Sequence, residues 1–97
     1  MKKKRYVIVR SELAGVFAGT LESRNGREVV LSRARRIWFW DGASSLSQLA
    51  IDGTSKPLNC KFPCEVESVE LLLAFEILDV SEKARQSIAS VPIWNGK

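Results

Sequence analysis

The chain has 97 residues, 45% of them hydrophobic and 27% charged, and a formal net charge of +4. This length corresponds to a single domain, residues 1–97, and the ordinary composition excludes a long disordered or low-complexity region. A domain this small buries only about two thirds of the surface of its unfolded chain. We therefore expect a small core supplemented by homo-oligomerisation, and a flexible basic tail at residues 1–4.

Charge is distributed unevenly along the chain. Residues 1–36 contain ten Lys or Arg and three Asp or Glu, whereas residues 37–97 contain five and eight. The net charges of these parts are therefore +7 and −3, which predicts a basic face and an acidic face. A basic face suits nucleic acid, nucleotides or an acidic partner, and the asymmetry also suits two protomers that dock basic to acidic.

Several classes of protein are excluded by what the sequence lacks. Histidine, the usual general base at neutral pH, is absent. Cys60 and Cys64 are too few for a disulfide scaffold or for a zinc site within one protomer, so we expect reduced and largely buried thiols. No phosphate-binding loop, nucleophile elbow or zinc signature is present. We therefore expect no catalysis, no metal and no cofactor.

The N-terminus does not continue as a targeting segment. MKKKR is followed by an apolar run of only four residues, which is too short for the core of a signal peptide. No segment approaches the ~20 apolar residues of a membrane span. We expect a protein that stays in the cytoplasm, away from membranes.

The first part of the chain is predicted to form strands. RYVIVR, residues 5–10, is a short strand whose alternate residues face opposite sides. Asn25-Gly26 suits a type I′ turn, because both residues tolerate positive φ. We therefore expect strand 14–24 to pair with strand 27–40 as an antiparallel hairpin.

Two features of this hairpin predict irregular pairing. Gly15 and Gly19 lie within a strand and indicate a bulge, or a close approach of another backbone or a ligand. In strand 27–40 neither set of alternate residues is purely apolar. We therefore expect a bulge or a break near residues 33–36.

The second part of the chain is predicted to contain two short helices. Ser44 or Ser45 caps the first, and Gly53 follows its end. Ser81 caps the second. Between them, segment 69–80 is apolar enough for either a helix or a strand, and the flanking β-branched residues favour a strand. The elements together predict an α+β domain: a small, mostly antiparallel β-sheet with an Asn-Gly hairpin and two short helices.

The most informative stretch is SRARRIWFWDG, residues 32–42. Guanidinium groups bind phosphate through paired N–H groups, and tryptophan faces stack on nucleobases. The candidate ligand-binding residues of this stretch are Arg33, Arg35, Arg36, Trp38 and Trp40. The alternative is that Trp38 and Trp40, which fall on the same strand face, lie in the core or in a protomer interface.

Small residues at the start of a helix continue this stretch. The sequence DGASSLSQ offers backbone N–H groups at a helix N-terminus, which is typical of an anion site. Gly42, Ser44 and Ser45 are therefore further candidates, although ordinary helix capping explains the same residues. An anion bound there would lie close to Arg35 and Arg36.

Two other charged clusters have ordinary explanations. The tail Lys2–Arg5 either binds phosphate backbones nonspecifically or is a solvated terminus. Glu65, Glu67 and Glu70 either form a metal or acid–base site or lie on a solvated strand face. No motif supports the metal or acid–base interpretation.

The stretches YVIVRS, AGVFAGTL, EVVLSRARRIWFWDGASSLSQLA and NCKF resemble, over nearly the whole chain, a family of similarly short proteins of tailed bacteriophages and prophages. That family is mostly known only as a conserved domain of unknown function. The chain also resembles the phage Thoeris anti-defence proteins of the first described type. These small oligomeric α+β proteins bind nucleotide-derived immune signals, such as cyclic ADP-ribose isomers, without cleaving them. The resemblance implies a counter-defence protein in the cytoplasm of the infected bacterial host, and it assigns no binding residue.

Three functions stay open at this point. In the first, the protein sequesters a nucleotide-type signal: Arg35 and Arg36 hold phosphate with N–H groups of residues 42–45, and Trp38 or Trp40 stacks the base. In the second, it is a nucleic-acid-binding phage accessory protein that uses its basic part. In the third, it is a structural or protein-interaction module without a small-molecule ligand.

Overall fold

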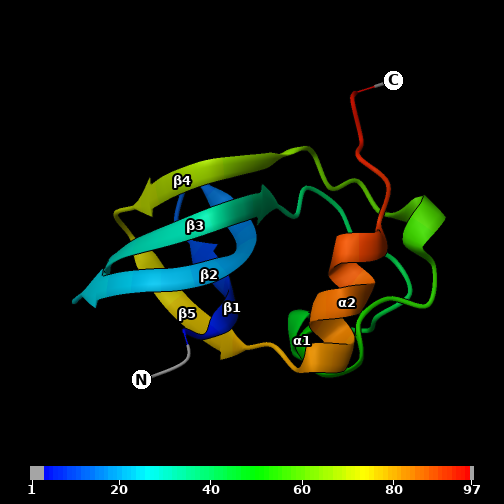
Figure 1. Cartoon of the computed structure of the whole chain (residues 1–97), viewed down its shortest axis with the longest axis horizontal. Helices are drawn as coiled ribbons and strands as arrows, with labels where there is room; N and C mark the ends of the chain where they lie inside the picture. Colours follow the sequence, from blue (N-terminus) through cyan, green and yellow to red (C-terminus); the bar gives the residue numbers. More distant parts are fainter. Residues whose placement is uncertain (1–3, 97) are drawn as a thin grey trace.

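The computed structural model describes residues 4–96, which form one five-stranded antiparallel sheet and two short α-helices. The strands are β1 (Tyr6–Ser11), β2 (Gly15–Asn25), β3 (Glu28–Arg36), β4 (Glu65–Leu71) and β5 (Ala74–Asp79). The helices are α1 (Leu46–Asp52) and α2 (Glu82–Ser90), and a 3-10 turn, η1, spans Pro57–Asn59. The expected α+β class is confirmed (Figure 1). The tail expected at residues 1–4 lies outside the described residues except for Lys4, which pairs with Glu22.

The sheet is strongly curled. Its strand order is β4-β3-β2-β1-β5, so β4 and β5 are the two edges. In the chain, only Leu72 and Leu73 separate these edge strands. Because three Cα steps span at most about 11 Å, the sheet must bend until its edges approach each other at this point. Figure 1 shows the bend: β4, β3 and β2 lie in front, and β1 and β5 pass behind them.

Two hydrophobic clusters follow from the alternation of side chains along β1. Val7 and Val9 belong to a cluster inside the curl, to which all five described strands contribute. Ile8 points to the opposite face, where Leu49 of α1 and Ile88 of α2 cover the sheet. The alternation predicted for this strand is therefore confirmed. The two helices pack on the outer face of the sheet, and α2 forms one wall of the site described below.

The predicted β2–β3 hairpin is present, but its loop lies one residue further along the chain. Asn25 pairs with Glu28, so the two loop residues are Gly26 and Arg27. Gly26 has φ +61, whereas neither Asn25 nor Arg27 has a positive φ. A positive φ at the first loop position alone is the pattern of a type II′ turn. The pairing is confirmed, and the prediction of a type I′ turn is wrong.

The bulge expected near residues 33–36 is present in β3. Opposite Gly19, β3 has one residue more than β2, and Arg33 there has φ +50. A Cβ at Gly19 would lie 3.1 Å from the Cα of Ala34, which is tighter than ordinary van der Waals contact. Gly19 therefore marks a close approach of two backbones, as its position in the strand predicted.

The strand predicted for residues 27–40 is too long. Strand β3 ends at Arg36, and Phe39 forms only an isolated bridge with Lys61. The physical reason lies in its neighbour. Strand β2 begins at Gly15, and the Val16 carbonyl accepts the last cross-strand bond, from the Ile37 N–H. Beyond that point there is no further β2 backbone to pair with, so residues 38–40 leave the sheet.

Segment 69–80 is extended, as favoured, but it forms parts of two strands at opposite edges of the sheet. Leu71 and Ala74 are buried inside the curl, whereas Leu72 and Leu73 are exposed. The turn at Leu72 and Leu73 therefore lies inside an unbroken apolar run of the sequence.

The helix boundaries predicted from the sequence are confirmed: the Ser45 hydroxyl caps α1, Gly53 ends it, and Ser81 caps α2. Within residues 4–96, no helix is long and apolar enough to cross a membrane.

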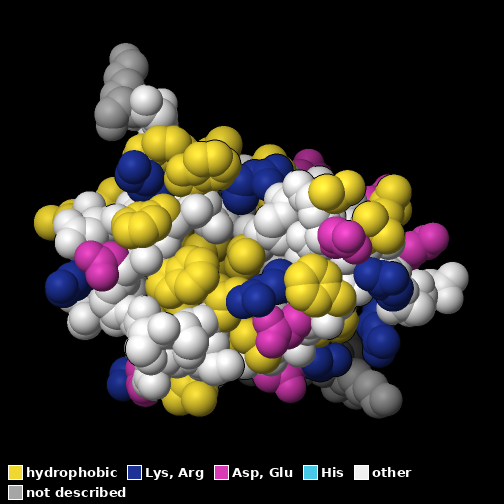
Figure 2. Space-filling view, turned by 180° about the vertical axis from the view of Figure 1, so that it is seen from behind, with side chains coloured by type: hydrophobic (Ala, Val, Ile, Leu, Met, Phe, Trp, Pro, Cys, Tyr) yellow, Lys and Arg dark blue, Asp and Glu magenta, His cyan; other side chains and the backbone are white. Residues whose placement is uncertain are grey.

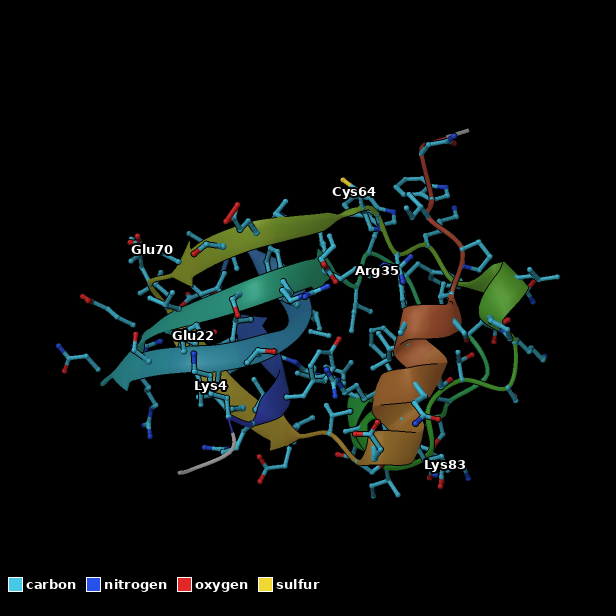
Figure 3. The ribbon with its side chains drawn as sticks, viewed as in Figure 1. Lys4, Glu22, Arg35, Cys64, Glu70 and Lys83 are labelled. Carbon is cyan, nitrogen blue, oxygen red and sulfur yellow. The ribbon has the colours of Figure 1, made fainter. Side chains whose placement is uncertain are left out.

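The two cysteines differ in exposure. Cys60 is buried and Cys64 is exposed, and neither forms a disulfide. The prediction of two largely buried thiols is therefore correct for Cys60 and wrong for Cys64. Cys64 lies at the start of β4, beyond the cover of the helices (Figure 3).

Candidate functional site

A cleft of about 460 Å³ opens between α2 and the outer face of the sheet. Its ionisable lining consists of Tyr6, Arg33, Arg35, Glu65 and Arg85, with Ile88 and Val91 on its apolar side. We call it the arginine cleft. Three guanidinium groups face one carboxylate there, and the volume lies within the range of small-molecule sites.

Arg35 forms the floor of the cleft. Its side chain lies between the end of β3 and α2 (Figure 3), and the residue is only 7% exposed. The guanidinium donates to five backbone carbonyl oxygens at 2.7–3.1 Å: those of Phe62, Pro63, Ile88, Val91 and Pro92. These bonds join β3 to the segment before β4 and to the last turn of α2. Arg35 therefore holds the cleft together rather than offering its N–H groups to a ligand, which corrects its predicted role.

The charge of Arg35 is not neutralised by a carboxylate. None of the ion pairs among residues 4–96 involves this side chain. Burial lowers the pKa of Arg35, but a guanidinium stays protonated in proteins at neutral pH. This buried charge, held by carbonyl oxygens and 5.4 Å from the Phe62 ring centroid, creates a positive potential at the cleft floor. The cleft therefore favours an anion.

Arg33 stands on the rim because of the β3 bulge. A residue with φ +50 other than glycine is uncommon, and bulges re-aim side chains next to functional sites. The Arg33 side chain is 78% exposed and lies 3.5 Å from Glu65 Oε1. An exposed pair of this kind is weak. Arg33 is thus free to exchange its carboxylate partner for a ligand phosphate.

Arg85 and Tyr6 form the opposite wall. The Arg85 guanidinium carbon lies 5.4 Å from the centroid of the Tyr6 ring, a cation–π contact. Burial raises the pKa of the Tyr6 phenol, although the nearby Arg85 charge acts in the opposite direction. The phenol is therefore a neutral hydrogen-bond donor at physiological pH. Neither residue was predicted as part of a site, because Tyr6 and Arg85 are 79 positions apart in sequence and no local pattern connects them.

The predicted arginine and tryptophan residues do not form one site. Arg36, Trp38 and Trp40 line a separate shallow groove of about 350 Å³ beside β2. Arg36 lies over the Phe17 ring at 4.3 Å. Trp40 is half-buried against the helix-side cluster, so the core interpretation holds in part for this residue. The bulge thus sends Arg33 and Arg35 to one cleft and leaves Arg36 with the tryptophans.

Trp38 is exposed and stacked on a residue that sequence reasoning missed. Its ring lies 6.1 Å from that of Trp94, with 10° between the planes. The Lys61 ammonium lies 5.6 Å from the Trp94 ring centroid. In the sequence, the only signal for this contact is the presence of a tryptophan, Trp94, in the C-terminal segment. On the face turned away from Figure 1, exposed hydrophobic side chains gather in patches with Lys and Arg between them (Figure 2).

The anion site predicted at Gly42, Ser44 and Ser45 is an ordinary helix cap. The Gly42 N–H donates to Asp41 Oδ1, and the Ser45 hydroxyl accepts from the Gln48 N–H. A Cβ at Gly42 would lie 2.6 Å from the Lys56 nitrogen, so this loop is closed against residues 54–56. Ser44 is exposed and has no role in the cap. These three residues are therefore removed from the candidate site.

The chain matches a known family over most of its length. The family described as Domain of unknown function (DUF6948) covers residues 4–88. The chain belongs to this family. The DUF6948 match contains all five described strands, together with Arg33, Arg35 and Arg85 of the cleft. Trp94 lies beyond it. No curated protein and no solved structure matches the chain.

Proposed function

We propose that this DUF6948 protein is a phage counter-defence protein that sequesters a nucleotide-derived signal without cleaving it. The ligand class is that of cyclic ADP-ribose or a cyclic nucleotide, and the ligand lies in the arginine cleft. The observation that carries the proposal is the floor of this cleft, where the buried, charged Arg35 takes part in no ion pair among residues 4–96 and Glu65 is the one carboxylate of the lining, against three guanidinium groups. A phosphate supplies the missing negative charge.

The remaining cleft residues have two proposed roles: contact with phosphate and contact with a base or ribose. Arg33 and Arg85 are exposed enough to turn their paired N–H groups toward phosphate oxygens. The Tyr6 ring and the exposed Ile93 side chain, which also lines the cleft, offer contact area for a base or a ribose. Arg35 acts through its field and by fixing the width of the cleft. Binding of this kind requires no general base and no nucleophile.

A second candidate function has its own supporting observation. The exposed Trp38–Trp94 stack, with Lys61 over Trp94, is a surface on which bases of a single-stranded nucleic acid can stack. This function predicts affinity that falls steeply with salt, because phosphate binding releases counterions. Loss of binding in Trp38→Ala, with binding retained in Arg85→Met, would assign the activity to this surface.

Isothermal titration calorimetry tests the first function. We expect cyclic ADP-ribose or a cyclic nucleotide to bind in a fixed ratio to the protomer. Arg33→Met and Arg85→Met should each lose about tenfold or more in affinity, as expected for a charged hydrogen bond of about 1.5–3 kcal/mol. Arg24→Met, an exposed arginine outside the cleft, serves as the control. Equal affinity in all four proteins, or no binding at all, would overturn the assignment to the arginine cleft.

A further inference from the structure

Strand β4 is an edge strand, and its first four residues are open on both faces of the sheet. Residues 65–68 are all exposed, although alternate residues of a strand with one covered face should be buried. One side of the β4 backbone pairs with β3, and the other side has no partner in the described sheet. Such an edge is a template for pairing with another chain.

The exposed side chains of β4 are acidic around an apolar centre. Glu67 and Glu70 take part in no ion pair among residues 4–96. Glu70 lies at the end of β4 away from α2 (Figure 3). Between the helix end and Glu67, the Val66 side chain is 43% exposed. A partner for this edge must therefore offer positive charge and an apolar contact.

The opposite edge of the same sheet has those properties. A hollow of about 500 Å³ beside β5 is lined by Arg5, Arg24 and Arg27, with Phe75 and Glu76. Phe75 is 55% exposed. Arg24 has no ion pair within the described part of the chain, and Arg27 has only a long one, 3.7 Å from Glu12. The β5 edge is therefore basic around an exposed aromatic ring.

We propose that the β4 edge of one copy docks on the β5 edge of a second copy of this chain. The β4 backbone pairs with residues 75–79 of the neighbouring β5, since the Ala74 N–H already donates to the Arg27 carbonyl oxygen of its own chain; this mode is known as β-augmentation. Because side chains alternate along a strand, Val66 and Glu70 project from one face of β4 and Glu67 from the other. One carboxylate on each face then meets the Arg24 and Arg27 side chains, and Val66 contacts Phe75. The β4 and β5 edges differ from each other and are complementary, so the contact between copies is head-to-tail. Repeated contacts of this kind close into a ring when the rotation from one copy to the next divides a full turn evenly. A symmetric β4–β4 or β5–β5 dimer is disfavoured because it opposes like charges.

A charge swap tests this assembly without any ligand. One variant, Glu67→Lys with Glu70→Lys, makes both edges basic, and the other, Arg24→Glu with Arg27→Glu, makes both edges acidic. Native mass spectrometry should show a multimer for the wild type and monomers for each variant alone. An equimolar mixture of the two variants should reassemble, because every contact in an alternating assembly is again between opposite charges. Circular dichroism of each variant confirms that it is folded.

The control is Lys83→Glu, which changes a charge on α2 away from both edges and should leave the multimer intact. A monomeric wild type at micromolar concentration would overturn the proposal. So would a multimer that either charge-reversed variant still forms alone, or a mixture that stays monomeric. The four substituted positions do not line the arginine cleft, so failure of assembly leaves the proposed ligand binding untouched.

Discussion

The Arg35 Nη2 group in β3 donates a 2.7 Å hydrogen bond to the carbonyl oxygen of Val91, just beyond the last turn of α2. This bond spans 56 positions of sequence and fixes the end of the helix against the bulged part of the sheet. The same side chain supplies the buried charge of the cleft. Stability and the proposed ligand binding are therefore coupled through one residue.

The first prediction concerns Arg35 itself. Arg35→Met keeps an apolar stem of similar length but removes the guanidinium donor from five carbonyl groups, of which only those of Phe62 and Ile88 keep a backbone N–H donor, from Trp94 and Val91. Each unsatisfied group costs about 1–3 kcal/mol, part of which relaxation recovers. We expect the free energy of unfolding to fall by at least about 3 kcal/mol. Arg24→Met should change it by less than about 0.5 kcal/mol, since Arg24 is exposed. Urea denaturation checks both, and equal stabilities would show that the carbonyl cluster does not need Arg35.

The second prediction separates strain from binding at Arg33. A non-glycine residue in the left-handed region costs about 1–2 kcal/mol, and part of this cost returns as chain entropy when glycine replaces it. Arg33→Gly should therefore raise the free energy of unfolding by about 0.5–1 kcal/mol and weaken ligand binding about tenfold. Arg33→Met should weaken binding equally without the gain in stability. Thermal denaturation and calorimetry measure the two effects. A lower free energy of unfolding for Arg33→Gly than for the wild type would contradict backbone strain at the positive φ of Arg33.

The third prediction concerns the loop before α1. Gly42 has φ +82, and an added Cβ would lie 2.6 Å from the Lys56 nitrogen. Gly26 has φ +61, and nothing lies within 4 Å of an added Cβ. Gly26→Ala should therefore cost only the conformational strain, about 1 kcal/mol. Gly42→Ala adds a steric clash with backbone and should cost about 3 kcal/mol or more. Chemical denaturation of the two variants gives the comparison, and similar losses would mean that the loop is not closed.

The fourth prediction uses the chain's single tyrosine as a probe. Burial raises the pKa of Tyr6 above its ordinary value of 10.0. The phenolate absorbance of the folded protein should therefore titrate at higher pH than that of the urea-unfolded chain. Because the folded state keeps the proton longer, this group's contribution to stability is complete below pH 10 and is lost as pH rises through the folded pKa. An anion bound beside Tyr6 should raise the pKa further. Coincident titration curves for the folded and unfolded protein would show that the Tyr6 phenol is exposed to water in the folded state.

Local signals predicted much of the fold. The alternation along β1, the β2–β3 hairpin and the caps at Ser45 and Ser81 depend on nearby residues, and each is present, although the hairpin loop is Gly26-Arg27 rather than Asn25-Gly26. The failures depend on contacts between distant segments. The end of β3 is set by where β2 begins, and the turn at Leu72 and Leu73 is set by the closure of the sheet.

The site was harder to predict than the fold. Arg33, Arg35 and Arg36 are neighbours in sequence, but the bulge and strand alternation direct them to a rim, an interior and a separate groove. Conversely, Tyr6 and Arg85 meet only because α2 folds back over β1. No spacing rule in one sequence encodes such a meeting, so the sequence pointed to Arg33 and Arg35 of the cleft but not to Tyr6 or Arg85.

The most direct test of the proposed function is native mass spectrometry of the purified protein after incubation with a signal-producing bacterial lysate. Bound material is released by heat and identified. The expected result is an intact nucleotide at a fixed ratio per protomer, which is absent from the Arg85→Met protein. A cleaved product would show an enzyme, and a protein that stays empty would show that the arginine cleft does not hold such a signal; either result would contradict the account.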